Sequence, residues 1–184
     1  MGSLKNKILI SMPHMIDPYF SKSVIYICEH NADGGMGLMI NKQFKPNDII
    51  EVFDKLSIGD NKVSALTSKI FFGGPVLLDR GIVLHNKDYA TKETINISDN
   101  FSITSQKDVL TELKNKPDTP FKLILGHCGW ASGQLEKEIE NGDWLIQSTT
   151  EDFIFRIKPE EMWQQAAGSL GINIGLSTGI SGQA

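Results

Sequence analysis

The chain has 184 residues, the length of one domain, and its hydrophobic content of 40% and charged content of 22% are those of a globular protein with a sizeable core. The formal net charge is −4, and the second half carries the excess, because residues 93–184 hold 7 Lys and Arg against 13 Asp and Glu. Phosphate binding needs clustered Lys and Arg, so this balance argues against a large nucleic-acid interface, and we expect no nucleic-acid partner.

The two cysteines and the two ends of the chain indicate in which cellular compartment the protein is expected. Cys28 and Cys128 lie far apart and fit neither a disulfide framework nor a zinc-ligand spacing, so we expect reduced thiols. Residues 1–15 have too short an apolar stretch for a signal peptide, and the uncharged stretch after Glu161 holds too many polar residues to cross a membrane. We therefore expect a soluble cytoplasmic protein with no membrane contact and no cofactor.

The first third of the chain predicts a strand followed by a β-hairpin. KILISMP (7–13) is an apolar run, and residues 22–30 are rich in β-branched and aromatic side chains. NADGG (31–35) is a turn sequence, after which residues 36–42 form the returning strand. A helix is predicted over Asp48–Leu56, where apolar residues recur at helical spacing.

The remaining elements follow one another without a regular alternation of strand and helix. The predicted strands are residues 69–72, 80–85, 93–97, 101–104, 121–128 and 143–148. The predicted helices begin at the capping-box residues 105–108, at Gly133 and at Pro159. Residues 152–157 fit neither pattern clearly.

Consecutive strands joined by tight turns indicate antiparallel pairing. The prediction is therefore an α+β fold in a single compact domain of residues 1–184. Its sheet is expected to be curved and mixed but mostly antiparallel, flanked by about four helices.

Two glycine-rich blocks hold most of the unusual residues. FFGGPVLLDRGIVLH (71–85) contains Gly73-Gly74-Pro75, and GHCGWASGQLEKEIENGDW (126–144) has three glycines among its first eight residues. Glycine permits sharp bends and close approach of two backbones, so we interpret both blocks as mainly architectural. His127 and Cys128 are adjacent on an extended segment and point to opposite faces, which disfavours a nucleophile–base pair.

The acidic helix inside the second block offers a different kind of candidate. Glu136 and Glu140 share one face of this helix, and Glu138 stands apart from them. Grouped carboxylates can serve acid–base or metal chemistry, whereas like charges on a short helix are more often simply solvated. Gln134 and Glu136 could instead hydrogen-bond to neighbouring loops without any catalytic role.

Four blocks in a fixed order resemble the AlgH/YqgE family of bacterial proteins. These blocks are MPHMIDPYFSKSVIYICEHNADGGMGLMINK (12–42), FFGGPVLLDRGIVLH (71–85), GWASGQLEKEIENGDW (129–144) and a helix that carries Trp163 before a glycine-dotted tail. The resemblance covers nearly the whole chain and implies a compact α/β arrangement built on a coiled, partly branched sheet.

The same resemblance implies no mechanism. The family takes its name from a genetic link to alginate regulation, and no reaction has been firmly established for it. Its members usually have Gly-Tyr-Ala before the Gly-Trp pair, where this chain has Gly126-His127-Cys128. A catalytic pair of His127 and Cys128 would therefore be missing from the family's usual form.

The preferred hypothesis is a non-enzymatic binding or regulatory protein, with an unknown small ligand or protein partner and with neither a catalytic residue nor a metal. Its candidate ligand-binding residues are glycines and polar or aromatic side chains near predicted strand ends. They are Pro13, His30, Asn41, Gly73, Gly74, His85, Gly129, Trp130, Gln134 and Glu136.

Two alternatives stay open. One is a hydrolase, either a thiol-dependent enzyme that uses Cys128 or a metal-assisted enzyme that uses His30, His85 and Glu138. The other is a transcriptional regulator, which the family's genetic name suggests, although the sequence has no helix-turn-helix signature and no basic recognition helix.

Overall fold

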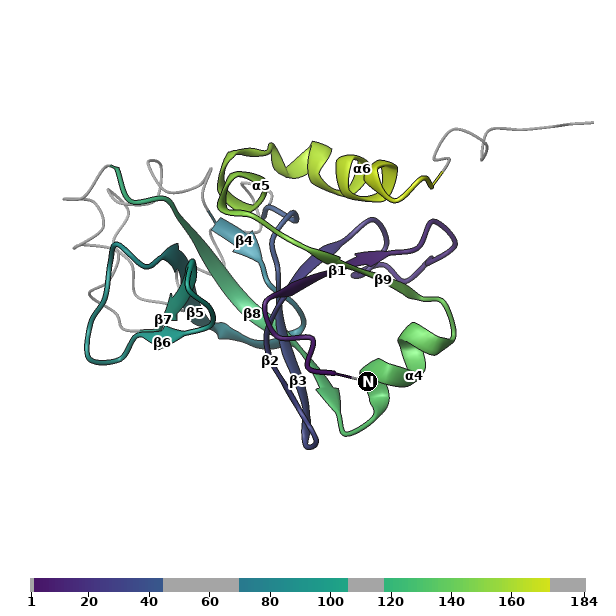
Figure 1. The fold of residues 1–184 in the computed structure, drawn as a ribbon, viewed down its shortest axis with the longest axis horizontal. Helices are drawn as coiled ribbons and strands as arrows, with labels where there is room; N and C mark the ends of the chain where they lie inside the picture. The colour runs from purple at the N-terminus through teal and green to yellow at the C-terminus, as the bar shows by residue number, and fades with distance from the viewer. Residues whose placement is uncertain (1, 45–69, 106–117, 173–184) are drawn as a thin grey trace, which may run out of the picture.

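The computed structural model describes residues 2–44, 70–105 and 118–172 (Figure 1). The strands in these ranges are β1 (Lys7–Ser11), β2 (Val24–Asn31), β3 (Gly34–Met39), β4 (Ile70–Phe72), β5 (Val76–Asn86), β6 (Ile95–Asn96), β7 (Phe101–Thr104), β8 (Phe121–Ala131) and β9 (Trp144–Ser148). The helices are α4 (Gln134–Glu140), α5 (Glu151–Arg156) and α6 (Pro159–Ser169). Within the described ranges, no helix has the length and apolar character needed to cross a membrane.

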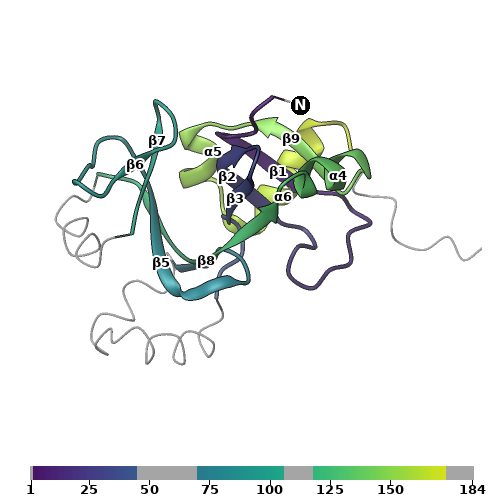
Figure 2. The ribbon, with the colours of Figure 1, turned by 90° about the horizontal axis from the view of Figure 1, so that it is seen from below.

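The strands form one curled sheet in the order β6-β7-β5-β8-β3-β2-β1-β9, with β4 added beside β8. Neighbouring strands are antiparallel except for the parallel pair of β4 and β8. β8 belongs to both parts of the sheet, because its first residues pair with β4 and β5 and its last four pair with β3. Figures 1 and 2 show β5, β6 and β7 on one side of β8 and β1, β2 and β9 on the other.

The hairpin of β2 and β3 joins the N-terminal part of the sheet, which is β1, β2, β3 and β9, to the end of β8. Asn31 Oδ1 accepts the backbone N–H of Asp33 at 2.8 Å, which closes the turn. Gly34 has a φ of 138°, and a Cβ at this position would lie closer than 3.0 Å to the carbonyl oxygen of Trp130. β3 can therefore pair with β8 at this point only because residue 34 has no side chain.

The core lies on both faces of the sheet. Alternate strand residues point to opposite faces, so Ile8 and Ile10 join the cluster beneath α5 and α6, while Leu9 joins the cluster beside α4. Figure 1 shows α5 and α6 above β1 and β9, with α4 below them. Trp163 Nε1 donates a hydrogen bond to the Ser11 carbonyl at 2.8 Å, which fixes α6 on β1.

The first half of β8 buries a lysine. Lys122 is 5% exposed, pairs with Leu84 of β5, and places its Nζ 3.9 Å from the centroid of the Phe71 ring. Burial lowers the pKa of Lys122 from 10.5 to about 8, because the charged form loses its hydration. The cation–π contact offsets only part of that loss.

The predicted curved, mostly antiparallel sheet is confirmed, and its strands and helices are arranged as an α+β fold. The expected number of about four helices is wrong for the described ranges, which hold three. One of them, α5, occupies the stretch that the residue pattern left ambiguous. The helices predicted over Asp48–Leu56 and from residues 105–108 lie outside the described residues.

Each predicted strand coincides with an observed strand, although several bounds differ. β5 begins at Val76 and not at residue 80, because an irregularity in its pairing with β8 between Val76 and Gly81 interrupts the residue pattern. β8 continues to Ala131, three residues beyond the predicted end. The predicted strand already contained Gly126, and the observed strand also includes Gly129.

Candidate functional site

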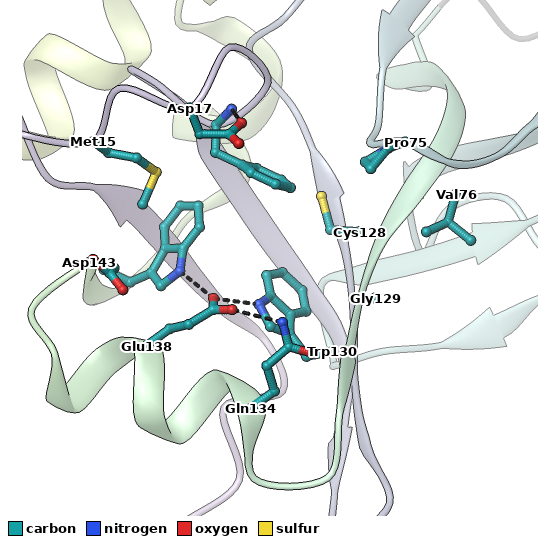
Figure 3. Close-up of a pocket in the computed structure, with 12 residues that line it drawn as sticks. Met15, Asp17, Pro75, Val76, Cys128, Gly129, Trp130, Gln134, Glu138 and Asp143 are labelled. Carbon is teal, nitrogen blue, oxygen red and sulfur yellow. Dashed lines mark hydrogen bonds between the residues drawn. The ribbon is translucent and has the colours of Figure 1, made fainter.

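A pocket of about 470 Å³ lies where the end of β8, α4, the start of β9 and the loop between β1 and β2 meet (Figure 3). Its walls are mostly aromatic and apolar, with a few carboxylates and one amide. The lining residues are Met15, Asp17, Phe20, Pro75, Val76, Cys128, Gly129, Trp130, Gln134, Glu138, Asp143 and Trp144.

The carboxylate of Glu138 is the centre of the polar contacts in this pocket (Figure 3). Its Oε2 accepts the indole N–H of Trp130 at 2.8 Å and that of Trp144 at 2.9 Å. Its Oε1 accepts the amide N–H of Gln134 at 2.8 Å. A carboxylate has about four acceptor positions, so these three donors leave one position open. Within the described residues, no salt bridge joins Glu138 to a basic side chain.

The local sequence explains why α4 presents Gln134 and Glu138 together. They are four residues apart and share one face of the helix, while Leu135 on another face is buried. Gln134 Oε1 also accepts the backbone N–H of Ala131 at 3.0 Å, which ties the helix start to the end of β8. Gly133, with a φ of 70°, makes the tight connection between them.

Two further carboxylates line the pocket. Asp17 Oδ1 accepts the backbone N–H groups of Tyr19 and Phe20 at 2.8 and 3.0 Å, which closes a turn in the loop between β1 and β2. The side chain of Asp143 is 37% exposed, and its Oδ1 lies 3.8 Å from Nε2 of the exposed His14. The lining thus contains three carboxylates and neither Lys nor Arg.

Cys128 lines the pocket but is a poor nucleophile. Its side chain is 1% exposed, and its Sγ donates a hydrogen bond to the Gly73 carbonyl at 3.2 Å. Burial raises the pKa of Cys128 to about 12, so the thiol is uncharged at neutral pH. Its partner in the described residues is a backbone carbonyl and not an imidazole. His127 precedes it on β8, and burial followed by the charge of Arg80 lowers the pKa of His127.

The two glycine blocks cross each other directly behind Cys128. A Cβ on Gly73 would lie closer than 3.0 Å to the carbonyl oxygen of Gly126, and a Cβ on Gly126 would lie equally close to the carbonyl oxygen of Gly74. Gly74 and Gly126 also have φ values of 145° and 74°. Two backbones therefore touch without side chains between them, and this crossing explains the glycines at 73, 74 and 126. The crossing does not explain the glycine at 129, since a Cβ there would meet nothing within 4 Å.

Three of the ten candidate ligand-binding residues, Gly129, Trp130 and Gln134, line the pocket. Among the others, Gly73 and Gly74 form the crossing behind it, and Pro13 is exposed on the loop after β1. The remaining four, Asn41, His30, Glu136 and His85, make contacts of their own outside the lining. The expected convergence of all ten residues on one cleft is therefore wrong.

Asn41 and His30 hold loops and strands together, and Glu136 lies beside His30. Asn41 accepts the N–H of Val24 at 2.8 Å and donates to the carbonyl of Lys22 at 3.0 Å. His30 Nδ1 accepts the backbone N–H of Leu4 at 3.2 Å, and its Nε2 lies 3.2 Å from Glu136 Oε1 without hydrogen-bonding geometry. These contacts show that Asn41 and His30 fix the chain around β2.

His85 lies at the opposite end of β8, where it pairs with Phe121, and it is fully buried. Its Nδ1 is 2.6 Å from the Asn86 carbonyl and its Nε2 is 2.9 Å from Thr104 Oγ1. Burial lowers the pKa of His85. The metal set of His30, His85 and Glu138 is therefore not assembled, and the described part of the chain contains no group of three His, Cys, Asp or Glu side chains placed to hold a metal.

The residue pattern did not identify Glu138, Asp17, Asp143 or Trp144 as ligand-binding residues. Glu138 is separated from the other acidic residues of its helix, and the sequence assigned it only to the alternative metal set with His30 and His85. The one usable signal was the pair of tryptophans on either side of the acidic helix, since a buried indole N–H needs an acceptor and Glu138 lies between them in the chain.

Fold and pocket together define a small α+β protein with a curled sheet and an aromatic, acidic pocket beside its last strands. The comparison with known families is specific: residues 8–175 match the AlgH-like family, and the chain belongs to this family.

Relatives with this fold and sequence occur in several bacteria. The chain is 42% identical over 178 residues to a UPF0301 protein of Photorhabdus laumondii, with 94% of each chain covered. It resembles the solution structure of the AlgH protein from Pseudomonas aeruginosa with a TM-score of 0.75 and 34% identity, covering 99% of this chain and 96% of that one. A crystal structure from Corynebacterium diphtheriae, at 19% identity and a TM-score of 0.67 over 92% and 87% of the two chains, shares the fold.

Proposed function

We propose that this protein is a non-enzymatic binding or regulatory protein of the bacterial cytosol, and that the pocket around Glu138 is its ligand or partner site. The observation that carries the proposal is the composition of the pocket, since about 470 Å³ of space is lined by apolar and aromatic side chains with a few fixed polar groups. Ligand sites in proteins commonly have this composition and size.

The polar groups of the pocket support binding more than catalysis. Two indole N–H groups already occupy Glu138 Oε2, so this oxygen is not free to take a proton from a substrate. Cys128 is a buried, uncharged thiol, and its hydrogen bond within the described residues goes to a backbone carbonyl and not to a base. Fixed donors and acceptors of this kind orient a ligand without reacting with it.

The indole N–H groups of the chain's three tryptophans provide a direct test by two-dimensional ¹H–¹⁵N NMR. Fragments and pooled bacterial metabolites that enter the pocket are expected to shift the signals of Trp130 and Trp144. The signal of Trp163 is the internal control, because its N–H donates to the Ser11 carbonyl in the other core cluster.

A blocking variant makes the same test sharper. Val76 lines the pocket and is 40% exposed, so Val76→Trp adds bulk there without disturbing the core and is expected to abolish the shifts. Ile95→Trp, at a 58% exposed position in β6, is the matched control. Absence of any shift with the wild-type protein across the library would contradict the proposal.

Thiol chemistry separates this proposal from a cysteine hydrolase. In a Cys28→Ala variant, Cys128 is expected to react with iodoacetamide at pH 8 about 1,000-fold more slowly than in the denatured protein, because its pKa is about 12 and not the usual value near 8.5. Mass spectrometry of timed samples measures both rates. Rapid, stoichiometric labelling of Cys128 in the folded protein would instead favour the hydrolase.

A further inference from the structure

The charge of the pocket indicates the class of its occupant. Its charged lining residues are Asp17, Glu138 and Asp143, all acidic, and the indoles of Trp130 and Trp144 form much of the wall. Carboxylates attract cations, and the faces of aromatic rings do so as well. An anionic ligand would be repelled, and a neutral one could fill the open acceptor position of Glu138 but would leave the negative charge of the three carboxylates without a counter-charge.

The surface around the pocket indicates whether a bound cationic group belongs to a protein or to a small molecule. We call residues 15–20 and 75–78 the rim, because both segments contribute lining residues to the pocket, and they carry large apolar side chains that are between 40% and 93% exposed. They are Ile16, Tyr19, Val76, Leu77 and Leu78. Of the seven exposed large hydrophobic residues in the described ranges, Val76 lines the pocket and the other four of these five are within two residues of a lining residue in the chain, whereas Ile95 and Leu170 are not.

Exposed apolar side chains around an acidic, aromatic pocket have the layout of a protein-binding surface. Arginine and aromatic anchors in desolvated pockets dominate such interfaces, and the residues around them exclude water. A small free amine would make use of the pocket but not of the rim, whereas a protein segment would cover both.

We propose that the pocket binds an arginine or lysine side chain of a partner protein, and that the apolar rim packs against the residues that flank it. The basic group is charge-complementary to Asp17 and Asp143 at the pocket and to the open acceptor position of Glu138. This inference rests on the proposed binding function and adds the identity of the bound group.

Peptide libraries with one fixed central residue and randomised flanks test the proposal. The central residue is arginine, lysine, citrulline (the neutral analogue of arginine) or glutamate, and the readout is the shift of the Trp130 and Trp144 indole signals. We expect arginine- or lysine-centred peptides to bind at least about tenfold more tightly than citrulline- or glutamate-centred ones, and the best flanks to be apolar.

The possible results separate this inference from the proposed function. Equal or tighter binding of citrulline- or glutamate-centred peptides would overturn the inference while leaving a binding pocket in place. So would agmatine, a free guanidinium compound, if it bound as tightly as the best peptide, because the rim would then contribute nothing. If neither peptides nor the fragment library shift the indole signals, both proposals fail.

Two charge-removing substitutions test the acidic lining without disturbing the fold. In Asp17→Asn the side-chain oxygen can still accept the N–H groups of Tyr19 and Phe20, and the Asp143 side chain contacts only His14 among the described residues. The double variant Asp17→Asn/Asp143→Asn is expected to bind arginine-centred peptides roughly fivefold or more weakly. Asp33→Asn/Asp99→Asn, at exposed turn positions, makes the same charge change elsewhere and should bind normally.

The apolar rim has its own matched pair of variants. Ile16→Ser, at a position 93% exposed, is expected to weaken binding of the best peptide several-fold while leaving binding of agmatine unchanged. Ile95→Ser should affect neither probe. Unchanged peptide binding in Ile16→Ser and in the double aspartate variant would contradict the proposal.

Discussion

Replacing Gly74 by alanine is expected to destabilise the protein by about 3 kcal/mol or more, enough to unfold many domains of this size. A Cβ at this position would lie closer than 3.0 Å to backbone atoms of His127 and Cys128, and backbone atoms of a paired strand cannot move aside. The φ of 145° adds conformational strain for any residue with a side chain. Urea unfolding followed by circular dichroism measures the loss.

Gly129→Ala is the matched control, because Gly129 lies in β8 beside the residues that Gly74 touches, and its Cβ would meet nothing within 4 Å. This variant should unfold within about 1 kcal/mol of the wild-type protein. Equal effects of the two substitutions would contradict the view that the glycines at 73, 74 and 126 exist for the crossing of the two backbones.

Replacing Lys122 by methionine is expected to stabilise the protein by about 1–3 kcal/mol at pH 7. The pKa of Lys122 falls from 10.5 to about 8 on folding, and each pKa unit corresponds to about 1.4 kcal/mol, so the charged lysine costs up to about 3 kcal/mol. Loss of the contact between Nζ and the Phe71 ring returns about 0.5–2 kcal/mol of that gain. Methionine keeps the length and fills the same apolar space.

The stability advantage of Lys122→Met is expected to depend on pH. Between pH 8 and pH 10.5 the unfolded chain binds more protons at Lys122 than the folded protein, so the wild-type free energy of unfolding gains from this residue as the pH rises. The advantage of Lys122→Met is therefore largest below pH 8 and shrinks towards pH 10.5. Lys87→Met, at an exposed position, should show neither effect. A stabilisation that does not change between pH 7 and pH 10 would contradict the argument.

The strands were predictable because their signal is local. Apolar and β-branched runs such as residues 7–11 and 121–125 report burial on a sheet directly, and the tight turns between strands report antiparallel pairing. α5 was not predictable in the same way. It has only six residues, and its start depends on the Thr150 side chain accepting the N–H of Phe153.

The glycine blocks were interpreted as allowing either sharp bends or close approach of two backbones, and the structure shows close approach at Gly73, Gly74 and Gly126. Sequence spacing indicates that glycine is needed, whereas it does not indicate which distant segment approaches it. The reason for Gly73 and Gly74 is the backbone of Gly126 and His127, more than fifty residues away. A sharp bend at Gly126 and a close approach by another strand predict the same residue, and only the structure separates them.

The candidate site was only partly predictable for a similar reason. Trp130 and Gln134 were placed in it because they belong to a distinctive block, and both do line the pocket. Asp17 and Met15 come from a loop more than a hundred residues earlier, and nothing in that loop indicates which strand end it faces. His85 was included because it ends a strand as His30 does, but β8 separates the two by its whole length.

β8 pairs with β4 and β5 at its start and with β3 at its end, and this arrangement has a consequence for the protein as it is being synthesised. β1, β2 and β3 leave the ribosome well before residues 121–131, so until then the outer edge of β3 has no partner strand. An open edge of this kind pairs readily with other chains. Chains truncated before residue 121 should therefore aggregate more readily than the full chain.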